Sequence, residues 1–224
     1  MSSLKLGRRL WSIGGLSMIL MALASCTHTS VFSLTDLDCA SCSSSVTTLV
    51  KKLDGVSDAR FDMLTVEVAI DHDPAVIAEA ELAERLRRAG FDAVVGPGKG
   101  RYQEGVAFPP GLDLAWLTRT GEFVDISKHA EQGKVTVFDF GAKWCSPCRE
   151  VDAEMVRILT SHPNVALRKL DVVSWDTPLA QRALQGVKAL PFVVVVDGKG
   201  REIDRISGLD LPRLRAAIER GTGR

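Results

Sequence analysis

The most constraining feature of this chain is the placement of its five cysteines, because each one falls in a short motif. Two pairs have the spacing Cys-x-x-Cys, namely Cys39 with Cys42 and Cys145 with Cys148. In an extended strand such a pair is too close for relaxed pairing, but at a loop-to-helix junction the two sulfurs converge and form a disulfide or bind one metal ion. The fifth cysteine, Cys26, ends a Leu-Ala-Ser-Cys run. Each Cys-x-x-Cys pair therefore has two candidate functions, metal binding and redox chemistry.

Composition narrows the class of protein. A chain of 224 residues has room for a leader and two small domains, or for one larger domain. Lys plus Arg and Asp plus Glu both number 28, so no charge excess favours a polyanionic partner. Aromatic residues make up 6% of the chain, which argues against base-stacking surfaces. We therefore expect no nucleic-acid partner.

Residues 1–25 have the pattern of a secretory signal peptide: basic residues, then an apolar run, then small residues. The apolar run of about 15 residues is shorter than the ~20 that a membrane-spanning helix requires. The Leu-Ala-Ser-Cys run resembles the bacterial lipobox, which implies that Cys26 carries a diacylglycerol and becomes the mature N-terminus. More than one acyl chain gives stable membrane attachment. We expect an exported, lipid-anchored protein facing the periplasm or the outer surface; the alternatives are an ordinary signal peptide cleaved near Ala24 or an uncleaved anchor.

Residues 30–95 alternate between strand and helix patterns. Residues 31–37 predict a strand, and apolar residues at 46, 49, 50 and 53 recur with the period of a helix. Alternation over residues 66–70 predicts a half-buried strand, a second helical pattern covers 77–89, and residues 91–95 predict a last strand. The expected order is βαββαβ, with an antiparallel sheet.

This segment resembles the heavy-metal-associated domain of metallochaperones and metal-transporting ATPases. The matching landmarks are Cys39-Ala-Ser-Cys42, Leu53-Asp-Gly55-Val56 and Ala89-Gly-Phe91-Asp-Ala93. The resemblance implies a ferredoxin-like fold in which Cys39 and Cys42 bind one soft ion, Cu(I) or Zn(II), at an exposed loop.

Two departures from that family affect the predicted metal site. Leu37 stands where the family usually has Met, and Asp38 directly precedes the first cysteine. A carboxylate at Asp38 would supply a third, harder ligand and favour zinc. The alternative is that Asp38 caps the following helix. A further alternative is that Cys39 and Cys42 form a redox pair without metal.

Residues 96–111 are rich in glycine and proline, which predicts a domain boundary. We expect a flexible linker there, long enough to let the two Cys-x-x-Cys sites meet.

Residues 112–224 have the pattern of a second α/β domain. The nearly continuous apolar run 135–140 predicts a central parallel strand buried on both faces, and it leads into the second Cys-x-x-Cys and a helix. Further strands are expected at 165–172, 192–196 and 201–207, the last two joined by a tight turn. Helices are expected to begin after Thr177 and Asp210.

This domain resembles thioredoxin, and more closely the exported thioredoxin-like proteins, through Trp144-Cys-Ser-Pro-Cys148 and the pattern that follows it. The resemblance implies that Cys145 is the exposed nucleophile and that Cys148 is the buried resolving thiol. It also implies that Pro191 is a cis-proline packed against the dithiol. The redox centre needs no cofactor.

The resemblance extends to three further positions. Asp139 matches a buried acid that manages the proton of Cys148, and Lys169 matches its basic neighbour. Gly141 stands where many members of the family have Trp. The smaller residue is expected to open the surface beside the site. The alternatives are a hydrogen-bonded core acid for Asp139 and a surface lysine for Lys169.

The expected chemistry is thiol–disulfide exchange. A helix N-terminus favours the thiolate of Cys145, which attacks a substrate disulfide before Cys148 resolves the mixed disulfide. Ser146-Pro147 is closer to the Gly-Pro of reducing thioredoxins than to the Pro-His of strong oxidants, so we expect a reductase acting on protein disulfides, metal-site proteins among them. The competing hypothesis is a metal-binding protein whose thioredoxin domain keeps Cys39 and Cys42 reduced in an oxidising compartment.

Overall fold

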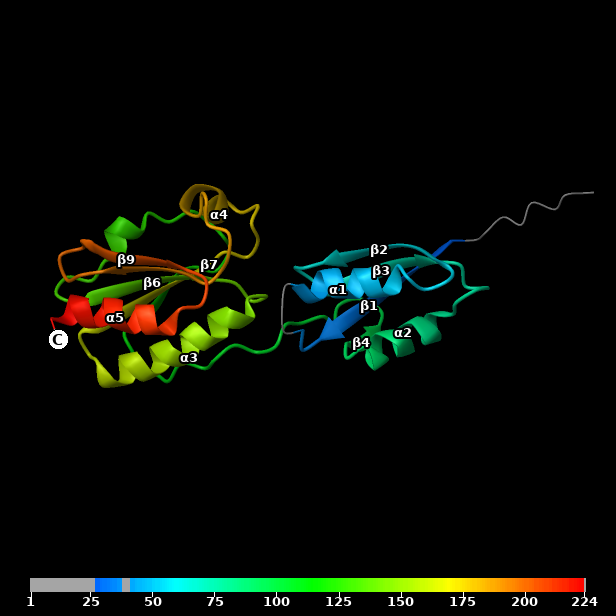
Figure 1. Ribbon diagram of the computed structural model, residues 1–224, viewed down its shortest axis with the longest axis horizontal. Coiled ribbons are helices and arrows are strands. Elements are labelled where there is room, and N and C mark those ends of the chain that lie inside the picture. Colours follow the sequence, from blue (N-terminus) through cyan, green and yellow to red (C-terminus); the bar gives the residue numbers. More distant parts are fainter. Residues whose placement is uncertain (1–26, 38–40, 224) are drawn as a thin grey trace, which may run out of the picture.

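The computed structural model describes residues 27–37 and 41–223 and contains two modules, each built on its own sheet (Figure 1). The first sheet has the strand order β2-β3-β1-β4, and the second has the order β5-β7-β6-β8-β9. The predicted fold classes, a ferredoxin-like module followed by a thioredoxin fold, are confirmed. None of the helices in these residues is long and apolar enough to cross a membrane.

The first module is an antiparallel sheet covered by two helices. Its strands pair β1 with β3, β1 with β4, and β2 with β3. Strand β2 has no alternating apolar pattern in the sequence because it is an edge strand on which only one residue, Ala59, is buried. The elements are β1 (His28–Thr35), α1 (Ser41–Val50), β2 (Val56–Asp62), β3 (Glu67–His72), α2 (Glu79–Arg88) and β4 (Asp92–Val95).

The core of this module lies between its sheet and its helices. Phe32 and Leu34 alternate along β1 and are completely buried, as are Leu82 and Leu86 of α2. Burial of each such side chain contributes roughly 1.5–3 kcal/mol, which is why the apolar spacing defines the packed faces. Helix α1 begins at Ser41, five residues before Val46, the first residue of the apolar stripe that predicted it.

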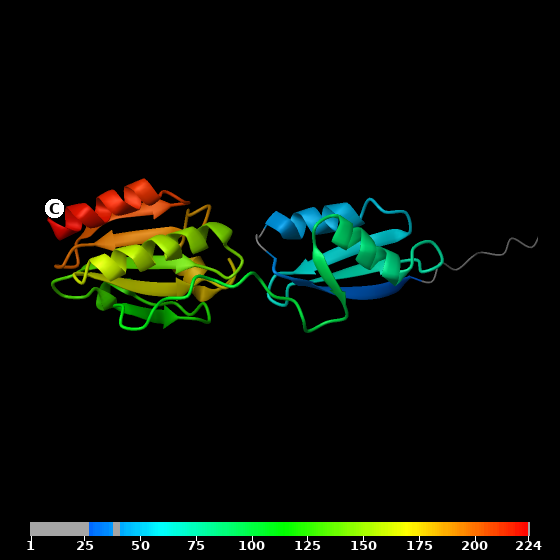
Figure 2. The ribbon, with the colours of Figure 1, turned by 90° about the horizontal axis from the view of Figure 1, so that it is seen from below.

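The first half of the predicted linker is hydrogen-bonded to the first module. The backbone N–H of Gly96 donates to Val31 (2.8 Å), that of Arg101 to Leu34 (3.0 Å), and that of Gln103 to the carbonyl of Leu37 (3.0 Å). Residues 96–103 thus follow β1, whereas the glycine and proline content predicted a flexible tether. Figure 2 shows the chain crossing to the second module after this segment.

The second module is a mixed sheet with helices on both faces. Strands β5, β7 and β6 pair in parallel, β8 pairs with β6 in the antiparallel direction, and β9 pairs with β8 in the antiparallel direction. Strand β5 and the short helix η1 were not expected from the sequence. The elements are β5 (Leu114–Thr118), η1 (Ile126–His129), β6 (Val135–Gly141), α3 (Ser146–Ser161), β7 (Val165–Asp171), α4 (Pro178–Ala183), β8 (Phe192–Val196), β9 (Glu202–Ser207) and α5 (Leu211–Thr222).

Two hydrophobic clusters hold these layers together. Helices α3 and α5 pack against one face of the sheet, with Met155 and Leu214 buried among the strand residues (Figure 1). Helix α4 contributes Leu179 to the cluster on the other face, where Phe138 and Phe140 are buried. Every residue of β6 is buried, as expected for the central strand. Strand β6 leads directly to the start of α3, which positions the site.

Candidate functional site

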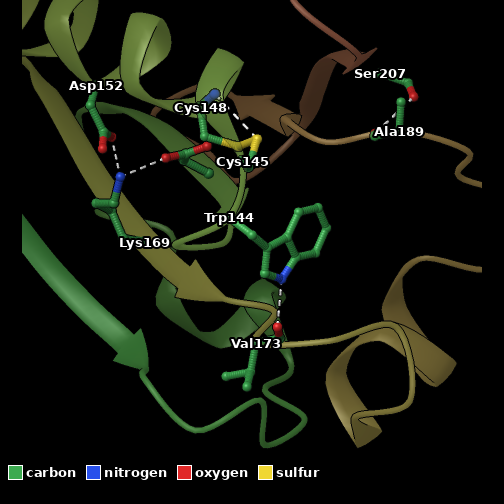
Figure 3. Close-up of a disulfide and its surroundings, with 9 residues drawn as sticks. Trp144, Cys145, Cys148, Asp152, Lys169, Val173, Ala189 and Ser207 are labelled. Atoms are coloured by element: carbon green, nitrogen blue, oxygen red, sulfur yellow. Dashed lines mark hydrogen bonds and ion pairs between the residues drawn. A yellow bond between two sulfur atoms is a disulfide. The ribbon is translucent and has the colours of Figure 1, made fainter. Parts of the chain in front are cut away.

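The second Cys-x-x-Cys forms a disulfide at the N-terminus of α3 (Figure 3). The Cα atoms of Cys145 and Cys148 are 5.3 Å apart, and their sulfurs are bonded. Cys145 is the N-cap residue, and its sulfur accepts a hydrogen bond of 3.2 Å from the backbone N–H of Cys148. Pro147 lies in the first turn, where its lack of an N–H costs nothing. A helix N-terminus stabilises negative charge, so this position favours a thiolate on Cys145 after reduction.

The two cysteines are buried to nearly the same extent in the oxidised protein. Cys145 is 4% exposed and Cys148 is 5% exposed. The resemblance implied an exposed nucleophile, but here Cys145 packs in the same hydrophobic cluster as Trp144 and Leu190. A substrate therefore reaches the disulfide only through the residues that pack around it.

Trp144, the residue before Cys145, is hydrogen-bonded to the turn after β7. The indole Nε1 of Trp144 donates a hydrogen bond of 2.6 Å to the carbonyl of Val173 (Figure 3). Val173 has a φ of 62°, which a β-branched residue rarely adopts. The carboxylate of Asp171 accepts its backbone N–H at 2.9 Å and supports this conformation. The Leu190–Pro191 peptide is cis and precedes β8, where Phe192 packs in the same cluster as the disulfide.

A buried charge cluster lies on the α3 side of the sheet. Asp139 and Lys169 are direct partners across β6 and β7, and Lys169 Nζ lies 2.9 Å from Asp139 Oδ2. The same ammonium also pairs with the carboxylate of Asp152 on α3 (Figure 3). Asp139 is 0% exposed and Lys169 is 4% exposed, so Lys169 is not a surface lysine. A buried charge is tolerated only when paired, and this lysine joins two acids.

The buried environment shifts the pKa values of Asp152 and Lys169. Burial raises the pKa of Asp152 to about 6, assisted by the negative charge of Asp139 and opposed by the positive charge of Lys169. Burial alone would lower the pKa of Lys169, but the carboxylates of Asp139 and Asp152 outweigh it and raise the pKa above its usual value. The rings of Phe108 and Trp116 lie 5.4 and 5.2 Å from the Lys169 ammonium and add cation–π stabilisation.

A cleft of about 720 Å³ opens beside the disulfide, and Gly141 forms part of its wall. A Cβ atom on Gly141 would lie 3.5 Å from both Cβ and Sγ of Cys148, so a larger side chain would extend over the resolving cysteine. Leu64 of the first module and Tyr102 of the linker also line the cleft. Its charged lining residues are Arg101, Glu104, Arg119, Lys143, Arg149, Asp152, Lys169 and Asp171.

The predicted metal loop and lipid attachment point fall outside the described residues. Cys26, Asp38 and Cys39 are among the residues that the structure does not describe. Cys42 is the second residue of α1 and packs against the core of the first module. Leu37, directly before the loop, forms a β-bridge with Tyr102, the residue that also lines the cleft.

Sequence reasoning missed Asp152 and the two aromatic residues that cover Lys169. A signal for Asp152 existed: it lies four residues after Cys148 and one after Val151, within the inward-facing stripe of α3, where a carboxylate is unexpected. Phe108 and Trp116 gave no such signal, because their approach to Lys169 depends on how the linker and β5 pack.

A disulfide at a helix N-terminus, backed by a buried acid–lysine pair, defines a thiol–disulfide oxidoreductase. The comparisons agree: residues 118–220 match the Thioredoxin family model. Thioredoxin H-type 1 of Nicotiana tabacum is 37% identical over 92 residues, covering 41% of this chain and 69% of that protein. Mitochondrial thioredoxin-2 of Schizosaccharomyces pombe is 31% identical over 112 residues, covering 50% and 81%. The chain belongs to the thioredoxin family and is a thioredoxin-like protein-disulfide oxidoreductase.

The first module matches a different family. Residues 31–92 match the heavy-metal-associated domain model. Among solved structures, oxidised MerP from Ralstonia metallidurans CH34 is 25% identical, with a TM-score of 0.30, and covers 31% of this chain and 96% of that one. Fasciola hepatica thioredoxin is 32% identical, with a TM-score of 0.34, and covers 43% and 86%. The two family models together show that a heavy-metal-associated module precedes a thioredoxin module in this chain.

Proposed function

We propose that this protein is an exported protein-disulfide reductase, tethered to a membrane by lipid on Cys26, with a first module that binds a soft metal ion through Cys39 and Cys42. The observation that carries the redox part is the Cys145–Cys148 disulfide at the N-terminus of α3, above the buried Asp139–Lys169 pair. Export and anchoring rest on the signal-like residues 1–25 and the Leu-Ala-Ser-Cys run.

The reaction proceeds in two exchanges. The thiolate of Cys145 attacks one sulfur of a substrate disulfide, which forms a mixed disulfide and releases the other substrate sulfur as a thiolate. Cys148 then loses its proton and attacks the sulfur of Cys145. The second substrate thiolate leaves, and the protein ends with its Cys145–Cys148 disulfide. The substrate gains two electrons, and a donor dithiol must return two to the protein.

In this reaction Asp139 takes the proton of Cys148. Side chains two residues apart on a strand share a face, so Asp139 points to the same side of β6 as Gly141. Gly141 faces Cys148, which puts the buried carboxylate beneath the start of α3. One oxygen of Asp139 has no hydrogen-bond partner among the described residues, so it is available as a proton acceptor.

The metal-binding first module determines which client proteins the thioredoxin module reduces. Two converging thiolates suit Cu(I), and a carboxylate from Asp38 would shift preference toward Zn(II). We infer that the clients are exported proteins whose metal-binding cysteines have formed disulfides, and that the metal module targets the reductase to them.

The test of the redox function is turnover of a protein disulfide. The reduced protein should reduce insulin, Cys145→Ser should be inactive, and Cys148→Ser should accumulate the mixed disulfide because only resolution is lost. The reduction potential should lie nearer the ~−270 mV of thioredoxin than the ~−120 mV of a strong oxidant. Mixed disulfides formed by Cys145→Ser would overturn the assignment of the nucleophile, and a potential at the oxidant end would make the protein a disulfide donor.

A second candidate function is supported by the shared cleft. Leu64 of the first module and Tyr102 of the linker line the cleft that reaches the disulfide, and Tyr102 is bridged to Leu37 beside the metal loop. In this function the protein carries metal, and the thioredoxin module keeps Cys39 and Cys42 reduced. A Cys39→Ser/Cys42→Ser variant that still reduces insulin at the wild-type rate would favour the first function. Exchange confined to the chain's own cysteines would favour the second.

A further inference from the structure

Asp152 is a second acid at the redox centre that the two exchange steps do not use. It shares the ammonium of Lys169 with Asp139, although one carboxylate is sufficient to pair one buried lysine. It lies one helical turn after Cys148, and residues four apart occupy the same face of a helix. Three elements, β6, β7 and α3, therefore bring two acids and a lysine together below the resolving cysteine.

The resolving step requires a route for a proton. Cys148 must lose a proton before it attacks Cys145, and it must regain one when the donor reduces the disulfide. Asp139 is 0% exposed, so a proton held there has no direct exit to water. The side chain of Asp152 is 14% exposed and lies in the wall of the cleft beside Gly141. Within the charge cluster, Asp139 is thus shielded from solvent, whereas Asp152 is in contact with it.

We propose that Asp152 acts through Lys169 as the solvent-side end of a proton path that runs from Cys148 through Asp139 to the cleft. The thiol of Cys148 gives its proton to Asp139. Lys169 accepts that proton while it donates one of its own to Asp152, so the ammonium keeps its charge. Asp152 then releases a proton to water, and the net result is one proton moved from Cys148 to solvent. The proposal rests on the proposed reductase function, and it makes Asp152 a positioning residue for proton transfer.

The electrostatics agree with this route. A carboxylate with a pKa of about 6 gains and loses protons readily near neutral pH, which a carboxylate at its ordinary pKa does not. The charged groups that face it are Asp139 from β6 and Lys169 from β7. Others in the cleft wall are Arg101 and Glu104 from the linker, Arg119 after β5, Lys143 before α3, Arg149 on α3 and Asp171 at the end of β7.

The test is the pH dependence of the resolving step in the full chain. Asp152→Asn keeps the size of the side chain but cannot take up a proton. The control is Glu150→Gln, an exposed position on the same helix outside the cleft. Formation and decay of the mixed disulfide with a fluorescently labelled disulfide peptide are followed by stopped flow between pH 5 and about 8, the range in which an acid of pKa ~6 titrates.

In the wild type and in Glu150→Gln, the decay rate should show an inflection near the pKa of Asp152. In Asp152→Asn the inflection should be lost and decay at neutral pH should slow several-fold, while formation of the mixed disulfide is unchanged. Asp152→Glu should restore the inflection. If Asp152→Asn does not fold, Asp152→Ala is judged by the same two rates.

An unchanged decay profile in the substituted protein would overturn the role of Asp152 and leave the reductase function intact. Absence of any mixed disulfide in the wild type would instead remove the proposed function itself. The two failures are therefore distinguishable in one experiment.

Discussion

Gly141 and Cys148 face each other so closely that a methyl group on Gly141 would touch both Cβ and Sγ of the resolving cysteine at 3.5 Å. The glycine leaves the cleft open to the disulfide, and the linker and the first module complete its walls. Access to Cys148 therefore depends on the absence of a side chain at Gly141 and on the residues of the first module that line the cleft.

The first prediction concerns that access. Gly141→Trp should place an indole in the cleft and slow the alkylation of Cys148 by iodoacetamide several-fold, measured in a reduced Cys145→Ser background. Gly141→Ala is the matched control, because 3.5 Å is an ordinary van der Waals contact and the cleft stays open. Equal alkylation rates in the Trp and Ala variants would show that reagents reach Cys148 by another route.

The second prediction concerns stability and pH. The pKa of Asp152 is about 6 in the folded protein against an ordinary value of 3.8, so the folded state binds more protons than the unfolded state between these values. The free energy of unfolding should therefore fall as pH rises from 4 to 6, by up to about 3 kcal/mol from this group. Stability contributed by the protonated acid is complete below the lower value and lost above the higher one.

Asp152→Asn should flatten this decline, and Glu150→Gln should keep it. Unfolding in urea can be followed by tryptophan fluorescence, because Trp116, Trp144 and Trp175 all lie in the second module. A decline of equal slope in Asp152→Asn would mean that another group titrates in this range.

The third prediction concerns metal. The protein should bind about one Cu(I) or Zn(II) per chain, because two thiolates on one loop are suitable ligands for soft ions. Cys39→Ser should abolish binding, and Cys145→Ser should leave the stoichiometry unchanged, as measured by titration under reducing conditions. Asp38→Thr should weaken Zn(II) more than Cu(I) if the carboxylate is a ligand. Retention of metal by Cys39→Ser would refute the site.

The fourth prediction concerns anchoring. Wild-type protein expressed in bacteria should fractionate with membranes, and mass spectrometry should find acyl chains on an N-terminal Cys26. Cys26→Ser should not be acylated and should move to the soluble fraction, because a lipid anchor is the proposed basis of attachment. A mature N-terminus at another residue, without acyl chains, would contradict the prediction.

Much of the fold was predictable because its signals are local. The apolar run from Val135 leads into a helix that begins at the second Cys-x-x-Cys, and the alternation around Val68 marks a half-buried strand; both depend on neighbours a few residues away. Pro147 and the cysteine spacing by themselves place Cys145 at a helix start. Motifs of this kind were sufficient to predict the order of the two modules and the redox pair.

The sequence alone thus determined which chemistry the chain carries: two Cys-x-x-Cys motifs, an acid six residues before one of them, and a glycine beside it. Only the tertiary structure decided which of these groups are in contact with one another. Asp139, Lys169 and Asp152 belong to three different elements, and residues 96–103 follow β1 through hydrogen bonds between distant segments. Contacts between segments far apart in the chain depend on packing and strand register, which no local pattern encodes, because closing such long loops is favourable only when the whole core forms.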